Sequence, residues 1–468
     1  PFMKQKTPMN SFQYPLKKSL RIEEYLNLFQ LDSQFGKVIE KASQWSIASY
    51  DIESMTQSAS SSDDDLKVDD SLLKEHFCGK TIASKQSMIM IGYLDYLDQE
   101  TKSRIFDIRQ YESSIDMVDD FLDFCLSRQK KATTLKRHLL HDLLQWIYKF
   151  KEAHFQYESC YQERIDALQE KIYHLEHPHV VEPKSNSSRT DQEKIKKRLW
   201  RQTLLGQFEH EIELFISRFY VFGFNSANYD LVLLAKPLVN LYYLRLTKQG
   251  SGRLSRRQRL SMQKEGNSVI SLSLNTLEFR DVLKMLGTAT SLDKFARMCD
   301  IKTTHKGIFP FEKLTSVEFL YETVLPSQAK DWQSRISSKK ITQDEVDNAL
   351  KLFADYQFAN VGEYLIHYLE KDVILLLEAL FKFWKMMCSM ANINFISHHS
   401  FTAASISIES SLHYLMKTQR INMFSQADAQ IYAVSMLWFL LPPLPTLLSD
   451  SFFSQFRWVN TLLLAVIL

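Results

Sequence analysis

The chain has 468 residues, enough for two or three domains of about 150 residues each. Hydrophobic residues make up 45% and charged residues 24% of it, and the low counts of 11 glycines and 11 prolines exclude collagen-like and broadly disordered chains. The net charge of +2 gives no overall signal for a nucleic-acid or membrane partner. Positions 184–264 nevertheless hold 16 Lys and Arg against 6 Asp and Glu, a local basic excess.

The cysteines and the apolar segments indicate the compartment. Five cysteines are spread along the chain without metal-ligand spacing or the pattern of a disulfide framework, which favours a reducing, intracellular compartment. No apolar stretch reaches the roughly 18 residues of a membrane span, and no signal peptide is evident at residues 1–20. We therefore expect a protein without a membrane segment; nucleus, viral replication site and mitochondrion are not distinguished.

The first half of the chain predicts an N-terminal helical segment followed by strands and a helical insertion. Leucines at helical spacing predict a long helix over 132–176, and a second helix is predicted over 191–217. The two helices are expected to form a helical hairpin inserted at 131–217. A Ser- and Asp-rich stretch predicts a solvated loop at 58–71. The remaining predicted elements are the helical segment 1–40, strands at 45–53, 87–94 and 103–108, and a helix at 114–127.

The second half predicts alternating strands and helices. A strong strand at 219–224 leads into a helix at 230–239. Strands at 241–246 and 269–274 are expected to form a hairpin joined by a basic loop over 248–264. Further helices are predicted at 281–286, 292–299, 341–355 and 363–387.

Acidic residues occur at three places that matter for chemistry. Asp51 and Glu53 end a strand and share one of its faces, Asp230 follows a strand, and Asp372 lies on a helix. Each place alone also has an ordinary structural reading: solvent-facing acids, a helix cap, or the polar side of an amphipathic helix. Together, acids from two strands and a helix can converge on two divalent cations, which prefer carboxylate oxygens. That arrangement is typical of two-metal phosphodiester hydrolysis.

In this order, the three acidic clusters resemble the Exo I, Exo II and Exo III motifs of the DEDDy 3′–5′ exonuclease domain of family B DNA polymerases. Segments 278–286 and 306–310 resemble the (S/T)Lx2h and Kx2h elements of the protein-primed members. The runs 309–325 and 358–377 are similar to the protein-primed polymerases of Polinton/Maverick-type transposons, viruses and linear plasmids. The resemblance covers about 36–55 and 215–432.

This resemblance implies an α/β fold: a ribonuclease-H-like exonuclease domain with a mixed sheet over 41–390, interrupted by the insertion, and the start of a polymerase palm over 391–432. Its implied cofactors are two Mg²⁺ or Mn²⁺ ions, and its implied partner is single-stranded or primer-terminus DNA. A terminal protein is a candidate partner, and no small-molecule cofactor is expected.

The resemblance also implies roles for individual residues. Tyr368 would orient the attacking water, and Lys306 would contact the scissile phosphate. Val282 departs from the family, because Ser or Thr stands at that position in the (S/T)Lx2h element. The implied metal ligands are Asp51, Glu53, Asp230 and Asp372, and the implied contacts to the single-stranded 3′ end are Ser54, Asn225, Tyr229 and Leu283.

The basic loop has two open readings. Arg256, Arg257 and Arg259 lie in a stretch without acids and could contact DNA phosphates. The same side chains could equally form a solvated hairpin tip.

Residues 433–468 form an apolar tail unlike the family, and the palm and thumb motifs have no counterpart. We therefore expect a truncated or frameshifted polymerase fragment that retains the proofreading exonuclease and extends no primer. Two alternatives stay open: a free-standing DEDD exonuclease, and a non-catalytic DNA-binding relic of a mobile element.

Overall fold

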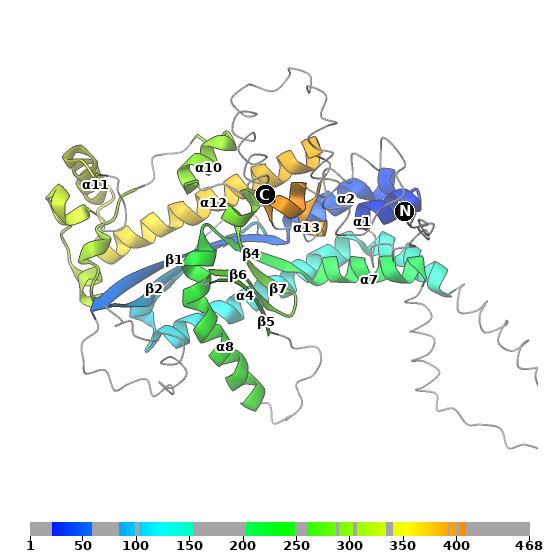
Figure 1. Cartoon of the computed structure of the whole chain (residues 1–468), viewed down its shortest axis with the longest axis horizontal. Coiled ribbons are helices and arrows are strands. Elements are labelled where there is room, and N and C mark those ends of the chain that lie inside the picture. The colour runs from blue at the N-terminus through cyan, green and yellow to red at the C-terminus, as the bar shows by residue number, and fades with distance from the viewer. Residues whose placement is uncertain are drawn as a thin grey trace, which may run out of the picture.

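The computed structural model describes residues 21–58, 84–98, 103–152, 203–248, 260–266, 268–286, 290–302, 307–333, 340–391, 393–398 and 402–407. Within these ranges the chain forms a mixed seven-stranded sheet covered by helices (Figure 1). The strands are β1 (Ile47–Ser58), β2 (Ser84–Asp95), β3 (Arg104–Asp107), β4 (Phe219–Gly223), β5 (Leu260–Glu265), β6 (Ser268–Leu274) and β7 (Leu277–Asp281). The longer helices are α2 (Asp32–Gln44), α4 (Ser114–Leu139), α7 (Leu204–Ser217), α8 (Asp230–Lys248), α11 (Gln343–Asp355) and α12 (Val361–Ala391).

The strand order across the sheet is β3-β2-β1-β4-β7-β6-β5. Strand β4 pairs in parallel with β1 on one side and with β7 on the other, and all other pairs are antiparallel. The strands β4 and β7 end together at the pair Gly223–Asp281, whereas β1 pairs with β4 only at its start and continues to Ser58. Asp51 and Glu53, which were expected at the end of their strand, therefore lie within β1. The mixed α/β architecture predicted from the sequence is confirmed.

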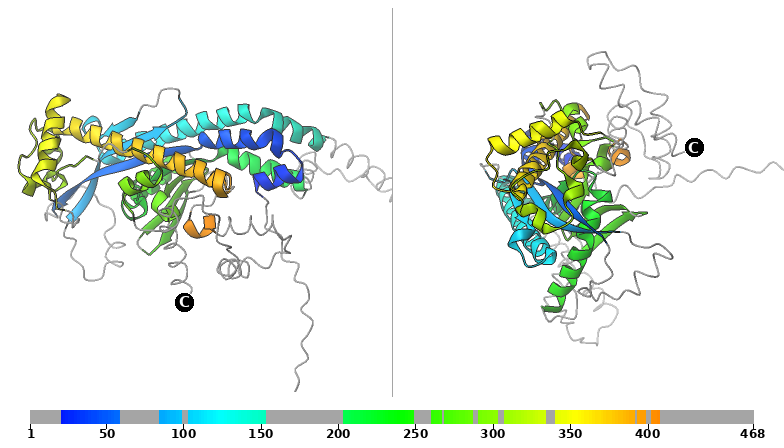
Figure 2. Two further views of the ribbon diagram at one scale, coloured as in Figure 1. Left: turned by 90° about the horizontal axis from the view of Figure 1, so that it is seen from above. Right: turned by 90° about the vertical axis from the view of Figure 1, so that its left-hand side faces the viewer.

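Helices cover both faces of this sheet (Figure 2). Alternate residues of β1 point to opposite sides, so Ala48, Tyr50 and Ile52 join an apolar core with α4 and α8. Ile47 and Met55 face the other side, where their cores include residues of α12. The 31-residue helix α12 is thus the main cover of one face, and α4 with α8 the cover of the other.

The shorter elements pack around the two ends of α12. At its N-terminal half lie α11 and the 3₁₀ turns η3 (Phe311–Lys313), η4 (Val317–Tyr321) and η5 (Ala329–Trp332), which share one core with α12. At its C-terminal half lie α1 (Ile22–Leu28), α2 and α13 (Phe395–His398). Buried Asn394 joins these parts, since it accepts a hydrogen bond from the Trp384 indole and donates one to the Ser43 hydroxyl.

A buried lysine fastens α4 to the sheet. The Lys136 ammonium is fully buried and donates three hydrogen bonds, to the Ser46 hydroxyl and to the carbonyls of Phe215 and Arg218. Ser46 immediately precedes β1, and Phe215 and Arg218 lie at the end of α7. The Lys136 side chain of α4 therefore joins α4 and α7 to the start of a central strand.

Most predicted elements are confirmed, but the predicted hairpin is wrong in its first strand. Residues 241–246 continue α8, because Leu231, Leu234, Leu238 and Leu241 recur at helical spacing and are buried in one core. The hairpin is instead formed by β5 and β6, with Gly266 in the left-handed region at φ +57°. The basic loop predicted at 248–264 is too long, because Lys248 ends α8 and residues 260–264 belong to β5. Its remaining part, 249–259, lies outside the described residues.

The predicted helical insertion is only partly described. Helix α4 runs without interruption through the predicted boundary between 127 and 132 and ends at Leu139, and a helix over 141–152 follows. Helix α7 begins at Leu204, where the Thr203 side chain caps it, so the predicted helix over 191–217 does not pass through this point unbroken. Outside the described residues lie the predicted loop at 177–190, most of the stretch 58–71, most of the predicted palm start and the tail 433–468.

None of the described helices combines the length and the apolarity that a membrane span requires. The described cysteines Cys125, Cys299 and Cys388 are free thiols.

Candidate functional site

Three of the predicted carboxylates meet beside the sheet. Oxygen atoms of Asp51, Glu53 and Asp372 all lie within 4.8 Å of one another. Asp51 is half-buried, whereas Glu53 and Asp372 are 8% and 4% exposed. Buried acids at this spacing repel one another unless a cation or protons neutralise them. The cluster therefore has the donor set and the spacing of a site for a hard divalent cation.

Close packing between β2 and α12 brings the acids together. Gly92 of β2 is the register partner of Asp51, and a Cβ on Gly92 would lie 2.8 Å from Cγ of Leu369 and 3.0 Å from Cγ1 of Val373. The Ser49 hydroxyl of β1 also donates a 2.7 Å hydrogen bond to the carbonyl of Val373, the residue after Asp372. A glycine and one buried hydrogen bond thus fix the helix that supplies the third acid.

Asp230 lies next to this group but is not one of the three mutually close acids. It begins α8 and is 5% exposed. Its pKa is raised well above the usual value, first by burial and then by the negative charges of Asp51 and Asp281. The fully buried Tyr50 phenol also has a raised pKa, because of burial and the charge of Asp230. Asp230 is thus a fourth carboxylate beside the three clustered ones, and a bound cation would stabilise its charged form.

The segment before Asp230 has an unusual backbone. Asn225 adopts φ 57° and ψ 23°, a left-handed conformation that Asn tolerates better than most residues. Its side-chain oxygen accepts a 2.9 Å hydrogen bond from the Asn228 amide, whose own oxygen accepts one of 2.6 Å from the Ser268 hydroxyl on β6. Tyr229, the next residue, is 46% exposed. The turn therefore presents a half-buried amide and an open aromatic ring.

Tyr368 lies one helical turn before Asp372 on α12 and is 8% exposed. Its ring packs in a tilted or edge-on manner against Phe309 and Phe311, with centroids 6.4 and 6.0 Å away, and a Cβ on Gly307 would lie 3.2 Å from it. The loop after the predicted phosphate-contacting residue therefore lies directly against the helix that carries Tyr368 and Asp372.

Two site residues were not predicted from the sequence. Phe311 is 38% exposed although it borders Tyr368, so it offers an exposed aromatic ring beside that tyrosine. Asp281 ends β7, is 2% exposed, and accepts hydrogen bonds from the backbone N–H groups of Ala227 and Leu283. Two sequence features could have pointed to them: Phe311 directly follows the Kx2h-like segment 306–310, and Asp281 is an acid at the end of a strand.

The other predicted residues divide into described and undescribed ones. Ser54 is half-buried and follows a register shift between β1 and β2, and Leu283 is half-buried on α9 (Val282–Leu286). Val282, the departure from the family pattern, is a fully buried core residue. The predicted residues outside the described ranges are Lys306, Arg256, Arg257 and Arg259.

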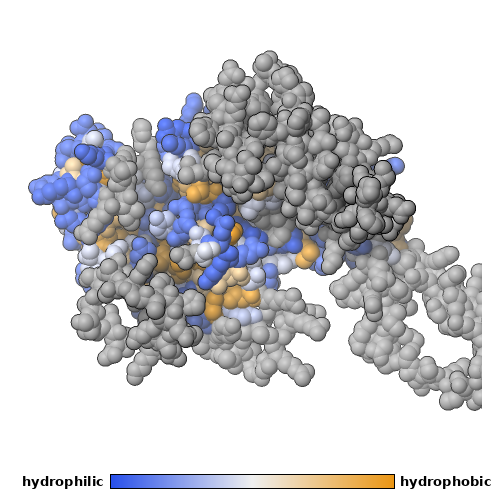
Figure 3. All heavy atoms as spheres, in the orientation of Figure 1, coloured by the Kyte–Doolittle hydropathy of each residue, from blue (hydrophilic) through white to orange (hydrophobic). Residues whose placement is uncertain are grey.

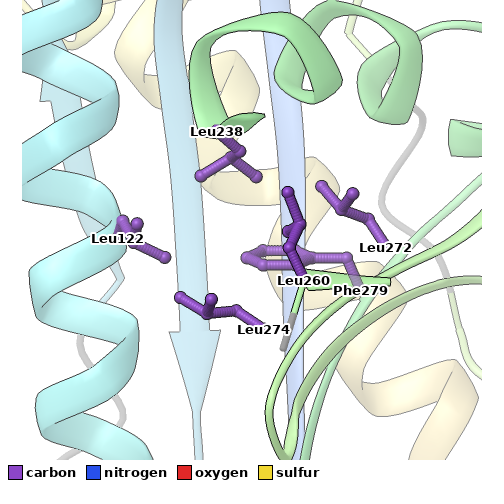
Figure 4. Close-up of a pocket in the computed structure, with 6 residues that line it drawn as sticks. All are labelled: Leu122, Leu238, Leu260, Leu272, Leu274 and Phe279. Atoms are coloured by element: carbon purple, nitrogen blue, oxygen red, sulfur yellow. The ribbon is translucent and has the colours of Figure 1, made fainter. Parts of the chain in front are cut away.

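An apolar pocket lies elsewhere in the fold. Six side chains from α4, α8 and the strands β5, β6 and β7 line it, with Leu122 and Leu238 facing the ring of Phe279 (Figure 4). The other three are Leu260, Leu272 and Leu274. None of these six side chains can bind a metal or transfer a proton, so the pocket offers no catalytic group. The described surface around α11 is largely hydrophilic, with hydrophobic side chains nearer the middle of the view (Figure 3).

Comparison with known proteins gives one match. Residues 216–431 match a family model described as DNA polymerase type B, organellar and viral. Neither a search of curated proteins nor a search of solved structures found a match. The matched region contains Asp230, Tyr368 and Asp372, whereas Asp51 and Glu53 precede it. The match supports a DNA polymerase function and the use of divalent metal ions.

Proposed function

We propose that the chain carries the 3′–5′ exonuclease of a protein-primed family B DNA polymerase and hydrolyses the terminal phosphodiester of single-stranded DNA. One observation carries this proposal. Asp51 and Glu53 lie far outside the segment that matches the polymerase family, yet they meet Asp372, inside that segment, within 4.8 Å. Acids from a strand and a distant helix converge as the DEDDy motifs require, and we therefore assign a ribonuclease-H-like exonuclease fold to the domain.

The residues present fit two Mg²⁺ or Mn²⁺ ions. Asp51, Glu53 and Asp372 offer only carboxylate oxygens, the ligands that these hard cations prefer. Asp230, with its raised pKa, is the ligand that we assign to the second ion. When bound, such ions would lower the pKa of a water molecule and stabilise the leaving 3′ oxygen. Neutralisation would also relieve the repulsion among buried acids that the fold holds together.

The chain's own groups would position the reactants. We assign the Tyr368 hydroxyl to the attacking water, because Tyr368 and Asp372 share one face of α12. The Lys306 ammonium is assigned to the scissile phosphate. Packing of the rings of Phe309 and Phe311 against Tyr368 would restrict the tyrosine to one orientation. A phenol held in this way can hydrogen-bond the attacking water and fix the direction from which the water approaches the phosphate.

The 3′ end of the DNA would be held by the turn at Asn225 and by Leu283. Tyr229 immediately precedes Asp230 and Phe311 borders Tyr368, and both carry exposed aromatic rings. Bases of any sequence stack on such rings. Ser54 would complete this contact set, and the arginines at 256, 257 and 259 would add salt-dependent phosphate contacts. A terminal protein remains a proposed partner that follows from the family alone.

Two other functions make different predictions. A free-standing exonuclease would hydrolyse DNA equally well, but the family match extends to residue 431, into the segment that resembles a palm. A non-catalytic DNA-binding relic would bind single strands and leave them intact. We favour the polymerase-linked exonuclease because the acids of all three motifs are present.

The test uses the full chain and a single-stranded oligonucleotide labelled at its 5′ or its 3′ end. With Mg²⁺, the 5′-labelled strand should shorten as a ladder, while the 3′-labelled strand should release labelled mononucleotide at once. Chelation by EDTA should stop both reactions. Binding without shortening under any metal condition would support the relic and contradict the proposal, and a ladder from the 3′-labelled strand would indicate the opposite polarity.

A further inference from the structure

Asp281 is a buried carboxylate to which the proposed chemistry assigns no role. It ends β7 beside Gly223 of β4 and is 2% exposed. Burying a charged group is costly unless hydrogen bonds compensate it. Burial raises the pKa of Asp281, and hydrogen bonds from the backbone N–H groups of Leu283, Ala227 and Asn225 act in the opposite direction. The carboxylate is therefore held by the main chain.

The two oxygens serve two different segments. Oδ2 accepts a 3.1 Å hydrogen bond from the Ala227 N–H, which belongs to η2 (Ser226–Asn228), and Oδ1 accepts one of 2.9 Å from the Leu283 N–H on α9. Some 54 residues separate Ala227 from Asp281 along the chain. A single side chain thus joins the turn after β4 to the helix after β7.

Both segments contain residues that we assign to the DNA strand. Asn225 and Tyr229 flank η2, and Leu283 donates one of the two hydrogen bonds itself. We infer that Asp281 is a positioning residue that holds the Asn225–Tyr229 turn and the Leu283 segment in one relative arrangement, so that both contact the same DNA 3′ end. This inference rests on the proposed function, because it takes the DNA contacts from it.

A carboxylate suits this role better than its neutral analogue. Both of its oxygens accept hydrogen bonds, whereas Asn presents one acceptor and one NH₂ donor. In Asp281→Asn at least one of these backbone N–H groups would face another donor, and the segment to which it belongs would be released. Asp281→Glu keeps the charge but adds a methylene, so it should release a segment without removing the carboxylate.

Glu278 provides a matched control on the same strand. It is 5% exposed, and its carboxylate pairs with the side chains of Arg280 at 2.6 Å and Arg218 at 4.0 Å, two residues outside the Asn225 turn and α9. Glu278→Gln therefore removes a buried charge from β7 and leaves in place the hydrogen bonds that Asp281 accepts from Ala227 and Leu283. A merely structural effect of losing a buried carboxylate should appear equally in both variants.

The experiment measures the affinity for a fluorescent single-stranded oligonucleotide in the Asp51→Ala/Glu53→Ala background, which the proposed function expects to bind the strand without degrading it. Adding Asp281→Asn should raise the Kd about tenfold, as expected for one lost hydrogen bond and a misplaced segment, and adding Glu278→Gln should leave it unchanged. In the otherwise wild-type chain, Asp281→Asn should raise KM for DNA by a similar factor while kcat at saturating DNA changes less than about threefold. Circular dichroism verifies folding, and Asp281→Glu replaces Asp281→Asn if the latter does not fold.

Amide hydrogen exchange tests the role of Asp281 without any substitution. The Ala227 and Leu283 amides should exchange slowly in the wild-type chain, and rapid exchange at either would overturn the inference. An unchanged Kd in Asp281→Asn, with normal hydrolysis by the wild-type chain, would overturn this inference alone. A wild-type chain that neither binds nor hydrolyses single strands would instead overturn the proposed function and this inference with it.

Discussion

Gly92 and Asp51 are register partners on adjacent strands, and the absence of a side chain at Gly92 lets α12 approach Asp51. A Cβ there would lie 2.8 Å from Cγ of Leu369, closer than real Cβ contacts allow. Leu369 and Val373 flank Asp372 on the contacting part of the helix. The distance between the acids of β1 and the acid of α12 therefore depends on this glycine.

Gly92→Ala should separate the acids. Displacing α12 overpacks a buried contact and should cost about 1–3 kcal/mol of stability. A shift of about 1 Å in catalytic groups can lower a rate about 100-fold, so hydrolysis should fall by about that factor. Thermal unfolding and single-turnover hydrolysis measure the two effects. Gly36→Ala is the control, because the atoms nearest to its added Cβ belong to the flexible Asp32 carboxylate. An unchanged rate in Gly92→Ala would contradict this account of the packing.

Tyr368→Phe tests the water-positioning role. It removes the hydroxyl and keeps the ring that packs against Phe309 and Phe311. Groups that position or transfer protons contribute roughly 10²–10⁴-fold to a rate, so single-turnover hydrolysis should slow by about that range with little change in stability. A loss of less than about threefold would assign Tyr368 to the core only.

Tyr364→Phe is the matched control for that experiment. Tyr364 precedes Tyr368 by one turn of α12, and its hydroxyl donates a 2.8 Å hydrogen bond to the carbonyl of Ile308. Its loss should cost about 0.5–1.5 kcal/mol of stability and leave the rate of hydrolysis unaltered.

Phe311→Ala should weaken the binding of single-stranded DNA. Stacking of one base on an aromatic ring contributes about 1–3 kcal/mol, and the half-exposed ring beside Tyr368 is placed to supply it. Fluorescence anisotropy measures the Kd. Tyr321, which is 58% exposed on η4, gives the control variant Tyr321→Ala, and equal Kd values for the two variants would remove Phe311 from the DNA site.

Asp230→Asn should stabilise the metal-free chain. The pKa of Asp230 is raised on folding, so the folded state binds more protons than the unfolded state above the carboxyl's ordinary pKa, and stability falls as the pH rises through that window. At pH 7 without metal, Asp230→Asn should therefore have the higher Tm, and the difference should shrink at lower pH. Hydrolysis should be lost.

Asp107→Asn is the control with the opposite sign. Asp107 is 2% exposed, but it pairs with Arg109 at 2.6 Å and accepts the Arg109 backbone N–H, so neutralising it should lower the Tm. A lower Tm for Asp230→Asn than for the wild type would show that Asp230 is compensated in the metal-free fold and would contradict the raised pKa.

Local patterns predicted much of this fold. Alternation marked β1 and a continuous apolar run marked β4, and period-2 spacing put Asp51 and Glu53 on one face of their strand. The order of the acids predicted that four of them converge; Asp51, Glu53 and Asp372 lie together, and Asp230 lies beside them. The convergence itself depends on β1 pairing with β4 and on α12 crossing the sheet, contacts made across more than 150 residues of chain.

Other features depend on tertiary contacts that no local pattern records. Residues 241–246 alternate well enough for a strand, but the apolar core under α8 makes them helical. Asp281 resembles any acid at a strand end, and only the fold shows that its two oxygens serve segments 54 residues apart. Phe311 follows a recognisable motif, yet its exposure beside Tyr368 arises from packing against α12.

The central claim is that the Asp51–Glu53–Asp372 cluster hydrolyses DNA, and the double variant Asp51→Ala/Glu53→Ala tests it most directly. The measurement is single-turnover shortening of a 5′-labelled single strand with Mg²⁺, alongside its Kd. The control Asp344→Ala/Asp347→Ala removes two exposed acids of α11 as a matched loss of two carboxylates. The account predicts that the cluster variant loses hydrolysis and retains most of its DNA affinity, while the α11 variant behaves as wild type. Residual hydrolysis within about tenfold of the wild-type rate, less than the loss of a metal site must cause, would contradict it.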